Sequence, residues 1–396
     1  MPHAHILRNR DFRHLWAAGA AGGLGSGMLV VAVPAHVYAV TGSVLATGVT
    51  LAFEHLPSLL LGPVSGVLAD RWDRRRLMIA TNLVHVLAVS VVLLARTPET
   101  VWLVYVAVLG QGMAAVFFRP AVRAHIPAVV GTGPALTSAN TVSAVTTGVV
   151  GLAGPPLGGL IFATSGVGAV VAAAAAAGLL AALAVARTSP RAAGERPEHA
   201  LVGEGLRTVW QAPATRGLLA ADGVYLLANA ALTALLIPFG VARLGGSTEV
   251  GYLLSALGLG FLLGAPVSRR LVDRFAPRRV ISIAQALAGV AFLLLFNSTT
   301  LPAALAAAAL LGLPGVTVLV AIQTYVQRAT PGRLLGRVTA AFLTVEAAAT
   351  MTGAFAGPAL SELSGLPVAL NAACAVTLLS SLVTLCLVPP SSRPVR

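Results

Sequence analysis

The sequence predicts an all-α membrane protein in which twelve transmembrane helices form two pseudo-symmetric six-helix bundles. Three observations support this: an extreme composition, twelve long apolar runs, and a repeat at half-chain spacing. Apolar residues make up 57% of the 396-residue chain and charged residues only 10%, whereas a soluble domain carries about 25% charged residues. A surface this apolar needs lipid as its solvent.

The apolar runs are each long enough to cross a bilayer, for which a helix of ~20 residues is needed. They lie at 15–39, 46–69, 77–95, 101–119, 138–163, 167–186, 216–241, 248–271, 279–297, 301–326, 338–360 and 366–388. The longest polar gap, 187–215, separates six runs from six. We therefore expect an N-terminal bundle at 1–187, a cytoplasmic linker at 188–215 and a C-terminal bundle at 216–396.

A repeat connects the two predicted bundles. Residues 63–77 read PVSGVLADRWDRRRL, and residues 266–280, which lie 203 positions later, read PVSRRLVDRFAPRRV. Each copy follows one apolar run and precedes another. A repeat at half-chain spacing in a hydrophobic protein is typical of transporters built from two homologous bundles.

The distribution of arginine predicts the orientation in the membrane. All 26 basic residues are arginine, and with a cytoplasmic N-terminus all but Arg96 and Arg243 fall on the cytoplasmic side. The net charge of +13 therefore reflects topology, and we expect no nucleic-acid partner. We expect a multi-pass protein of the cell (inner) membrane with both termini in the cytoplasm.

Motifs of soluble enzymes do not account for this chain. It contains no GxxxxGK[ST] nucleotide-binding motif, and Ser, His and Asp fall in no nucleophile arrangement. Cys374 and Cys386, twelve residues apart in one apolar run, have no metal-ligand spacing and are too distant for a disulfide. We expect no enzymatic activity, no cofactor and no metal.

Several motifs resemble one transporter family over almost the whole chain. Gly66–Arg75 resembles the loop 2–3 motif of the major facilitator superfamily, with Asp73 where a glycine is usual. Gly154–Gly159 resembles the GPxxGG core of a fifth-helix antiporter motif, and Gly353–Pro358 repeats it in the second half. The chain resembles the drug/proton antiporter branch, which includes enterobactin-exporter-like and macrolide-exporter-like proteins. The resemblance implies the major facilitator fold, a monomer and alternating access.

The resemblance also implies roles for the motif residues. In the family, the loop aspartate binds a helix N-terminus in one conformation and releases it in the other; a carboxylate at a helix N-terminus contributes ~0.3–1 kcal/mol. The proline motif is associated with a helix bend that seals the cavity. The gating residues expected here are Gly66, Asp70, Arg71 and Arg75, with Asp273 and Arg274 in the second half. Those expected at the bend are Gly154, Pro155, Gly158, Gly159, Gly357 and Pro358. The alternatives are topology-setting arginines and ordinary small-residue packing.

Two departures from the family concern proton coupling. Many antiporters carry an arginine in the fourth helix ahead of Gln-Gly, but here Gly110 precedes Gln111-Gly112. A first-helix acid after glycine is frequent in the family and is Ser26 here. A proton relay through either position cannot be carried over to this chain.

Three acidic residues lie well inside apolar runs and away from their ends: Glu54, Asp222 and Glu346. Each is costly there, by ~2.5–3.5 kcal/mol on insertion scales, so each is a functional candidate. A carboxyl group away from water can exchange protons in the physiological range, which proton-coupled transport requires. His55 and Asn140 are further candidates for a proton or substrate cavity. The alternative is a neutral carboxyl group that bonds two helices together.

The function predicted is export of an amphipathic small molecule, such as a drug, antibiotic or siderophore, by proton antiport. The partners are this substrate, protons and the lipid bilayer. Uptake of a metabolite by symport is one alternative, and it predicts a cavity with more charged binding groups. A membrane scaffold or sensor without transport is another, and the repeated loop motif argues against it.

Overall fold

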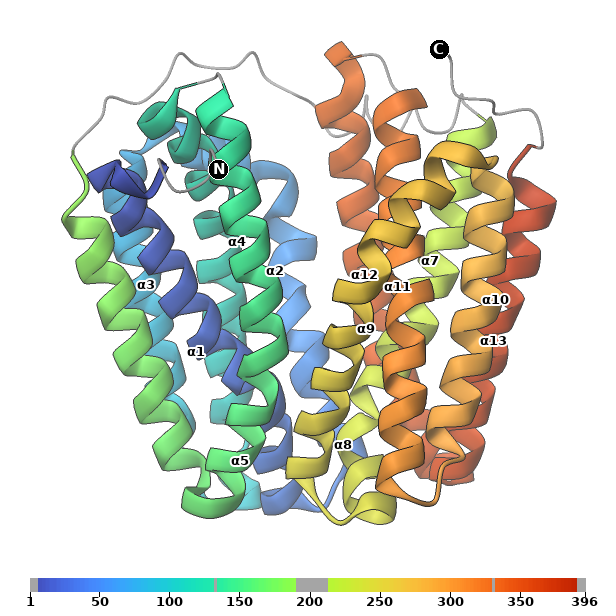
Figure 1. Ribbon diagram of the computed structural model, residues 1–396. Helices are drawn as coiled ribbons and strands as arrows, with labels where there is room; N and C mark the ends of the chain where they lie inside the picture. Colours follow the sequence, from blue (N-terminus) through green and yellow to red (C-terminus); the bar gives the residue numbers. More distant parts are fainter. Residues whose placement is uncertain (1–5, 132–133, 190–212, 330–331, 390–396) are drawn as a thin grey trace. The chain divides into compact units, whose positions relative to one another are not determined.

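The computed structural model describes residues 6–131, 134–189, 213–329 and 332–389, and the regular structure in these ranges is helical (Figure 1). The side chains of residues 63–71 and of Asn140 are among those that fall outside this description. So does residue range 190–212, which is most of the predicted linker.

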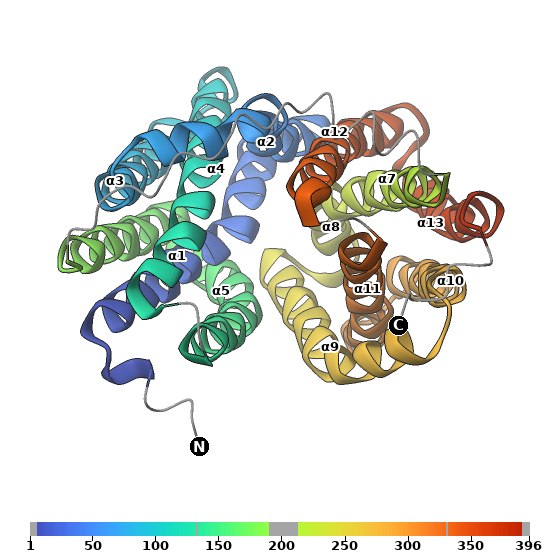
Figure 2. The same cartoon turned by 90° about the horizontal axis from the view of Figure 1, so that it is seen from above.

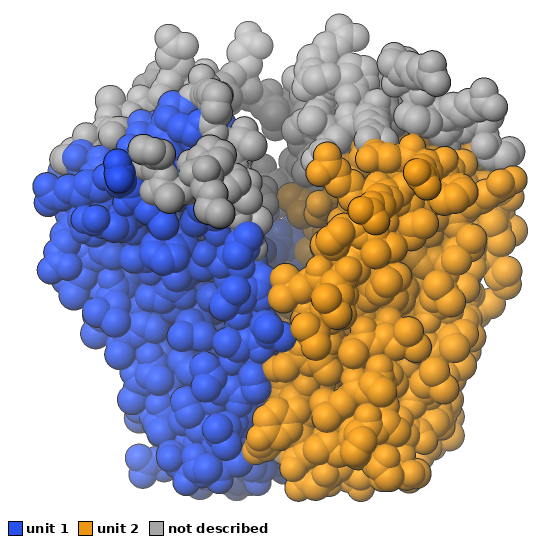
Figure 3. Space-filling model, in the orientation of Figure 1, with its two compact units in different colours: residues 1–42, 56–199 blue, residues 43–55, 200–396 orange. Residues whose placement is uncertain are grey.

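The chain divides into two compact units (Figure 3). Unit 1 comprises Met1–Gly42 and Leu56–His199, and unit 2 comprises Ser43–His55 and Ala200–Arg396. Helix α2 (Val44–Arg71) contributes to both, because its first segment packs with unit 2. The sequence gives no signal for this grouping.

The other helices of unit 1 are α1 (Arg10–Thr41), α3 (Arg74–Val91), α4 (Trp102–Val130) and α5 (Pro134–Ala186), with short 3-10 turns at Val92–Leu94 and Pro98–Thr100. Those of unit 2 are α7 (Pro213–Ala234), α8 (Leu236–Phe239), a π-helical turn (Gly240–Leu244), α9 (Ser247–Arg274), α10 (Pro277–Phe296), α11 (Leu301–Ala329), α12 (Gly332–Ser364) and α13 (Leu366–Leu387). Figure 2 shows these helices from above.

Local signals explain where the first helices of the chain begin and end. The Asn9 side chain accepts a hydrogen bond from the Phe12 N–H at 3.1 Å and caps α1. Gly42 ends α1 in the left-handed region, at φ 65°, which glycine adopts without steric penalty. Asp73, where the family usually has glycine, accepts a hydrogen bond from the Arg76 N–H at 2.7 Å and caps α3.

The twelve predicted spans correspond to helices of the structure. Ten helices among the described residues are long and apolar enough to cross a membrane. One of them, Val145–Ala186, contains a break at Gly166, where φ is 75°, so α5 comprises the predicted spans 138–163 and 167–186. The predicted span 338–360 is α12. The fold is the twelve-helix architecture that the sequence predicts.

The predicted seventh span, 216–241, is interrupted. Helix α7 ends at Ala234, and α8 begins at Leu236. Pro238 explains the break, because it has no N–H to bond to the Ala234 carbonyl oxygen four residues earlier. The short α8 and the π-helical turn then lead to Gly245.

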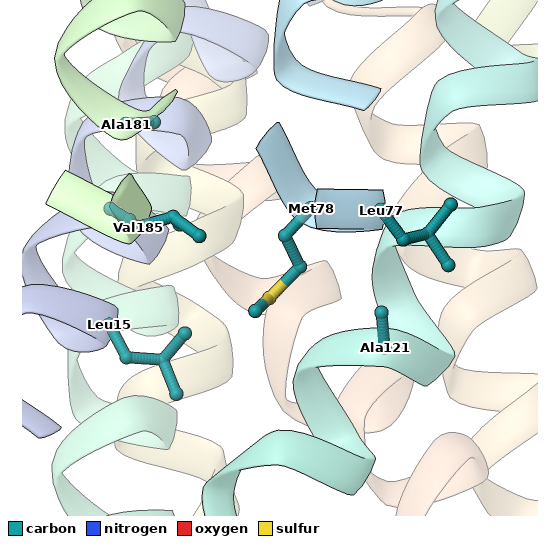
Figure 4. Close-up of a cluster of buried hydrophobic side chains, with 7 residues drawn as sticks. Leu15, Leu77, Met78, Ala121, Ala181 and Val185 are labelled. Carbon is teal, nitrogen blue, oxygen red and sulfur yellow. The ribbon is translucent and has the colours of Figure 1, made fainter. Parts of the chain in front are cut away.

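Apolar side chains lie both between the helices and on the outer surface. In unit 1, Leu15, Leu77, Met78 and Val185 belong to one buried cluster (Figure 4). Large apolar side chains are also widely exposed in both units, including Leu87, Leu180 and Leu263. Exposure on this scale fits helices whose solvent is lipid.

The first segment of α2 is bound to α12 within unit 2. The Glu362 carboxylate accepts hydrogen bonds from the Ser43 hydroxyl at 3.0 Å and the Leu45 N–H at 3.1 Å, and so caps the start of α2. One turn further on, Gly48 lies against the Ala354 carbonyl oxygen and Pro358 of α12. A carboxylate at a helix N-terminus is also favoured by the helix dipole.

Candidate functional site: a carboxyl pair in an apolar cavity

Two of the predicted intramembrane acids meet in unit 2. The side chains of Asp222 on α7 and Glu346 on α12 line one cavity, where their carboxyl groups are close enough to interact. Asp222 is only 5% exposed, and Glu346 is partly buried. An ionised carboxylate has acceptors but no donor, so a hydrogen bond between two carboxyl groups requires a proton on one of them. The structure therefore brings together two acids that the sequence predicts as separate candidates.

The pair lies on the wall of a partly open cavity of about 330 Å³ that is lined by helices of unit 2. Helix α7 presents Asp222, Tyr225 and Asn229 to this cavity. These residues are three and seven positions apart, which places them on one face of a helix. The remaining wall is mostly leucine and phenylalanine from α9, α10 and α11, and Gln323 adds a polar group.

Aromatic rings form part of the cavity wall. Phe292 and Phe296 stack with ring centroids 6.1 Å apart, and Phe239 meets the edge of Phe296 at 5.0 Å. Tyr225 is 6% exposed and lies one helical turn from Asp222. Such pairs hold the rings in fixed orientations, which gives the cavity a rigid apolar surface.

Glu54 and His55 are not among the residues that line this cavity. Glu54 is exposed on the first segment of α2. His55 follows it, and its Nδ1 donates a hydrogen bond to the Leu51 carbonyl oxygen at 3.0 Å within the same helix. The side chain of Asn140, in α5, lies outside the described residues.

The repeated loop motif is only partly described. Gly66, Asp70 and Arg71 lie in α2, but their side chains are outside the description. Asp273 and Arg274 occupy the last turn of α9, and Phe275 follows as its C-cap residue.

Arginines at matching positions of the two repeats make matching contacts. Arg75 at the start of α3 donates to the Ala186 carbonyl oxygen at the end of α5. Arg278 at the start of α10 donates to the Leu385 carbonyl oxygen near the end of α13. A cation at a helix C-terminus satisfies exposed carbonyl groups and complements the helix dipole. Each contact joins two helices of the same unit.

The predicted helix-bend motifs are sites of close helix contact. Pro155 lies inside α5, and a Cβ at Gly154 would be 2.9 Å from the Gly27 Cα of α1. Gly158 lies against the Met28 backbone in the same way, and Gly159 follows it in α5. In unit 2, a Cβ at Gly357 would be 2.9 Å from the Ala231 Cα of α7, and Pro358 contacts α2 at Gly48. Both motifs therefore place backbones close together, as small residues do in membrane helices.

Sequence reasoning identified the acids of the site but missed Tyr225 and the aromatic wall. Asp222 and Glu346 stand out because charges are rare in apolar runs. Phenylalanines and tyrosine in such runs have no comparable signal. The sequence shows that Tyr225 lies three residues from Asp222, but it does not show which other helices face these two residues.

A twelve-helix fold with a pair of carboxyl groups beside an apolar cavity is typical of a membrane transporter of the major facilitator type. The sequence profile of the transmembrane secretion effector family, within that superfamily, matches residues 3–393. The chain therefore belongs to this family of the major facilitator superfamily.

Relatives and solved structures agree with this assignment. The multidrug efflux pump Tap of Mycolicibacterium fortuitum is 30% identical over 88% of each chain. The enterobactin exporter EntS of Shigella boydii serotype 4 is 28% identical over 67% of this chain and 65% of that one. The nucleoside transporter NupG shares the fold, with a TM-score of 0.80 over 95% of this chain and 98% of that chain, at 10% identity. The names of Tap and EntS are those of an efflux pump and an exporter, and the match to NupG shows the fold alone.

Proposed function

We propose that this protein exports an amphipathic small molecule from the cytoplasm in exchange for protons. The observation that carries this proposal is the pair of carboxyl groups, Asp222 and Glu346, on the wall of a mostly apolar cavity. The names of Tap and EntS support export as the direction of transport. The protein works as a monomer in the cell membrane, with both termini in the cytoplasm.

The chemistry of the pair accounts for coupling. When both carboxyl groups are protonated, the pair carries no net charge. It can then take up no further proton and attracts no counter-ion. Loss of one proton leaves a buried negative charge that is stable only with a nearby positive charge or water. Substrate and proton therefore compete for one site, and this competition links their movements. Alternating access presents the site to one side of the membrane at a time.

The conformational change is controlled by the loop motif, in this proposal. Asp70 and Arg71, with Asp273 and Arg274 in the second half, make contacts that differ between the two conformations. Arg75 and Arg278 have a different role: each contacts another helix of its own unit and holds the two helices together. Gly154 and Gly357 hold neighbouring helices in register during the movement.

A susceptibility panel in an efflux-deficient bacterial host tests export. The host expresses the wild type, Asp222→Asn, Glu346→Gln or the control Glu249→Gln, with membrane abundance measured for each. Glu249 lies in the first turn of α9 and does not line the cavity. We expect the wild type and the control to raise resistance to at least one compound, and both cavity variants to lose that resistance.

Everted membrane vesicles from the same strains measure direction and coupling. Compounds identified by the panel should accumulate inside respiring vesicles, and a protonophore should abolish the accumulation. Glu54 is the competing candidate for the proton, so Glu54→Gln is included. Export that persists in Glu346→Gln and is lost in Glu54→Gln would refute the role of the pair. Substrate movement in the opposite direction would identify an uptake symporter.

A further inference from the structure

We propose that a second, small cavity of unit 2 binds the phosphate group of an anionic phospholipid, and that Arg243 is its principal contact. The cavity has a volume of about 80 Å³ and is lined by residues of α8, the π-helical turn, the end of α10 and the start of α13. It is distinct from the cavity of the carboxyl pair, because the described linings of the two share Phe296 alone. The inference therefore goes beyond the proposed export function and does not depend on it.

Arg243 is an exception to the charge distribution of the chain. It is one of two arginines, out of 26, that the predicted topology places on the outer side. Topology favours basic residues in the cytoplasm, so an arginine at the outer end calls for another explanation. It lies in the π-helical turn, a rare conformation that often marks functional sites. Its side chain is exposed, lines the cavity and forms no ion pair with a carboxylate of the described residues.

Contacts on both sides of Arg243 fix the backbone that carries it. The π-helical turn begins at Gly240, and a Cβ there would overlap the Val250 side chain of α9, so the turn packs closely against that helix. In α8, the Phe239 ring meets the edge of the Phe296 ring with centroids 5.0 Å apart, and both rings line the cavity. The guanidinium therefore extends from a well-defined position beside the end of α10.

Asn297, Ser298 and Asn371 supply the other polar groups of the cavity. The Asn297 amide donates to Asn371 Oδ1 at 3.0 Å and to a carbonyl oxygen of its own helix at 2.9 Å, which leaves its own Oδ1 as an acceptor. The Asn371 amide donates to the backbone at 2.9 Å and has a second N–H. The Ser298 hydroxyl donates to the backbone at 2.6 Å and can still accept. The cavity thus offers donors on Arg243 and Asn371 for a phosphate, and two acceptors for hydroxyl groups.

Size and charge determine the class of ligand. A volume of about 80 Å³ is well below the ~300–1,000 Å³ of pockets for drug-sized molecules, so the cavity fits a single chemical group. The planar guanidinium binds two phosphate oxygens at once, and the N-terminus of α13, which begins at Leu366, also favours a negative charge. The described lining contains no carboxylate to bind an ammonium group. These features favour a phosphodiester that carries hydroxyl groups, as in phosphatidylglycerol, over one that carries an amine, as in phosphatidylethanolamine.

A stripe of exposed apolar side chains leads along α10 to the cavity. Ile283, Leu287, Val290 and Leu294 are exposed and three or four positions apart, so they lie on one face of the helix. Ser298, one turn beyond Leu294, continues this face and lines the cavity. An acyl chain can therefore lie along α10 while its headgroup occupies the cavity. The membrane also holds the headgroup near the cavity at a high effective concentration, which a free phosphate lacks.

Native mass spectrometry of the full-length protein tests this inference, because it counts bound lipids and gives the Kd of each. The delipidated protein in detergent is titrated with dioleoyl phosphatidylglycerol or dioleoyl phosphatidylethanolamine. We expect the tightest site to prefer phosphatidylglycerol by about fivefold or more, the factor that corresponds to one arginine near an anionic lipid surface. Arg243→Gln should remove this preference. Equal affinity of the wild type for the two lipids would overturn the inference.

Arg96 provides a matched control, because it is the other arginine on the outer side. Its Nε donates to the Leu93 carbonyl oxygen at 3.2 Å, and it does not line the cavity. Arg96→Gln removes the same charge and should keep the preference for phosphatidylglycerol, whereas Arg243→Lys, which keeps the charge without the paired donors, should keep part of it. A monodisperse gel-filtration profile establishes that each variant is folded. Wild-type preference in Arg243→Gln, or an equal loss in Arg96→Gln, would contradict the proposal.

Soluble probes distinguish a lipid from a free phosphate as the source of the bound group. Inorganic phosphate and glycerophosphoglycerol, which is the headgroup without acyl chains, are added to the protein with phosphatidylglycerol bound. We expect either probe to displace the lipid only at a concentration roughly a hundredfold or more above that of the lipid. Displacement at equal concentration would show that the cavity takes a free phosphate, and would overturn the assignment to a lipid.

Discussion

Replacing Gly48 with alanine would force α2 away from α12. A Cβ at this position would be 2.5 Å from the Ala354 carbonyl oxygen and 2.9 Å from the Pro358 Cβ, whereas ordinary contact begins at 3.4 Å. Relief requires a displacement of about 1 Å in a contact between two backbones, and overpacking of this kind costs typically 1–3 kcal/mol. The hydrogen bonds from Ser43 and Leu45 to Glu362 lie one turn away and would be strained by the same displacement.

Gly62 provides a matched control in the same helix. A Cβ at Gly62 meets no atom within 4 Å. Alanine is favoured over glycine in a helix by up to about 1 kcal/mol, and this gain is common to both substitutions. The difference between Gly48→Ala and Gly62→Ala therefore isolates the steric cost of the contact with α12.

The thermal unfolding of both variants, followed by fluorescence in detergent, measures this difference. Each kcal/mol corresponds to roughly 2–4 °C for a folding unit of about 200 residues, so Gly48→Ala should melt roughly 2–12 °C below Gly62→Ala. Equal melting temperatures would refute the close approach of α2 and α12 in unit 2.

Two further predictions concern the repeated loop motif and the helix that follows it. Asp73→Ala should destabilise α3 by ~1 kcal/mol because the Arg76 N–H loses its cap, whereas Asp73→Asn, which retains an acceptor, should be nearly neutral; equal melting temperatures of these two variants would exclude the capping role. Asp70→Asn should abolish export at unchanged membrane abundance, because the proposed gating contact requires a carboxylate; full drug resistance in this variant would remove Asp70 from the mechanism.

The fold could be predicted because lipid imposes a strong pattern on the sequence. Every span must satisfy its backbone internally and expose apolar side chains, so twelve apolar runs translate directly into helices. Departures from that pattern are local and have chemical causes, such as Pro238 in α8, just after the end of α7, and the positive φ of Gly166 within α5. Each residue interrupts the helical backbone, and neither changes the number of spans.

The site was predicted only in part, since its geometry depends on contacts distant in sequence. Asp222 and Glu346 were each identified as rare intramembrane acids, but they line one cavity from helices that are separated in the sequence by four others. Asp73 was noted as a departure from the family motif, and only the structure assigns it a capping role. Gly48 is one of 41 glycines and could not be distinguished from the others by sequence.

The central claim is that the Asp222–Glu346 pair is the site where substrate displaces a proton. It is tested most directly by adding a compound that the susceptibility panel identifies to the unbuffered detergent-solubilised protein and measuring proton release with a pH indicator. We predict proton release when the compound binds to the wild type and to Glu54→Gln, and none from Asp222→Asn/Glu346→Gln. The same release from the folded double variant, or its loss in Glu54→Gln, would contradict the claim.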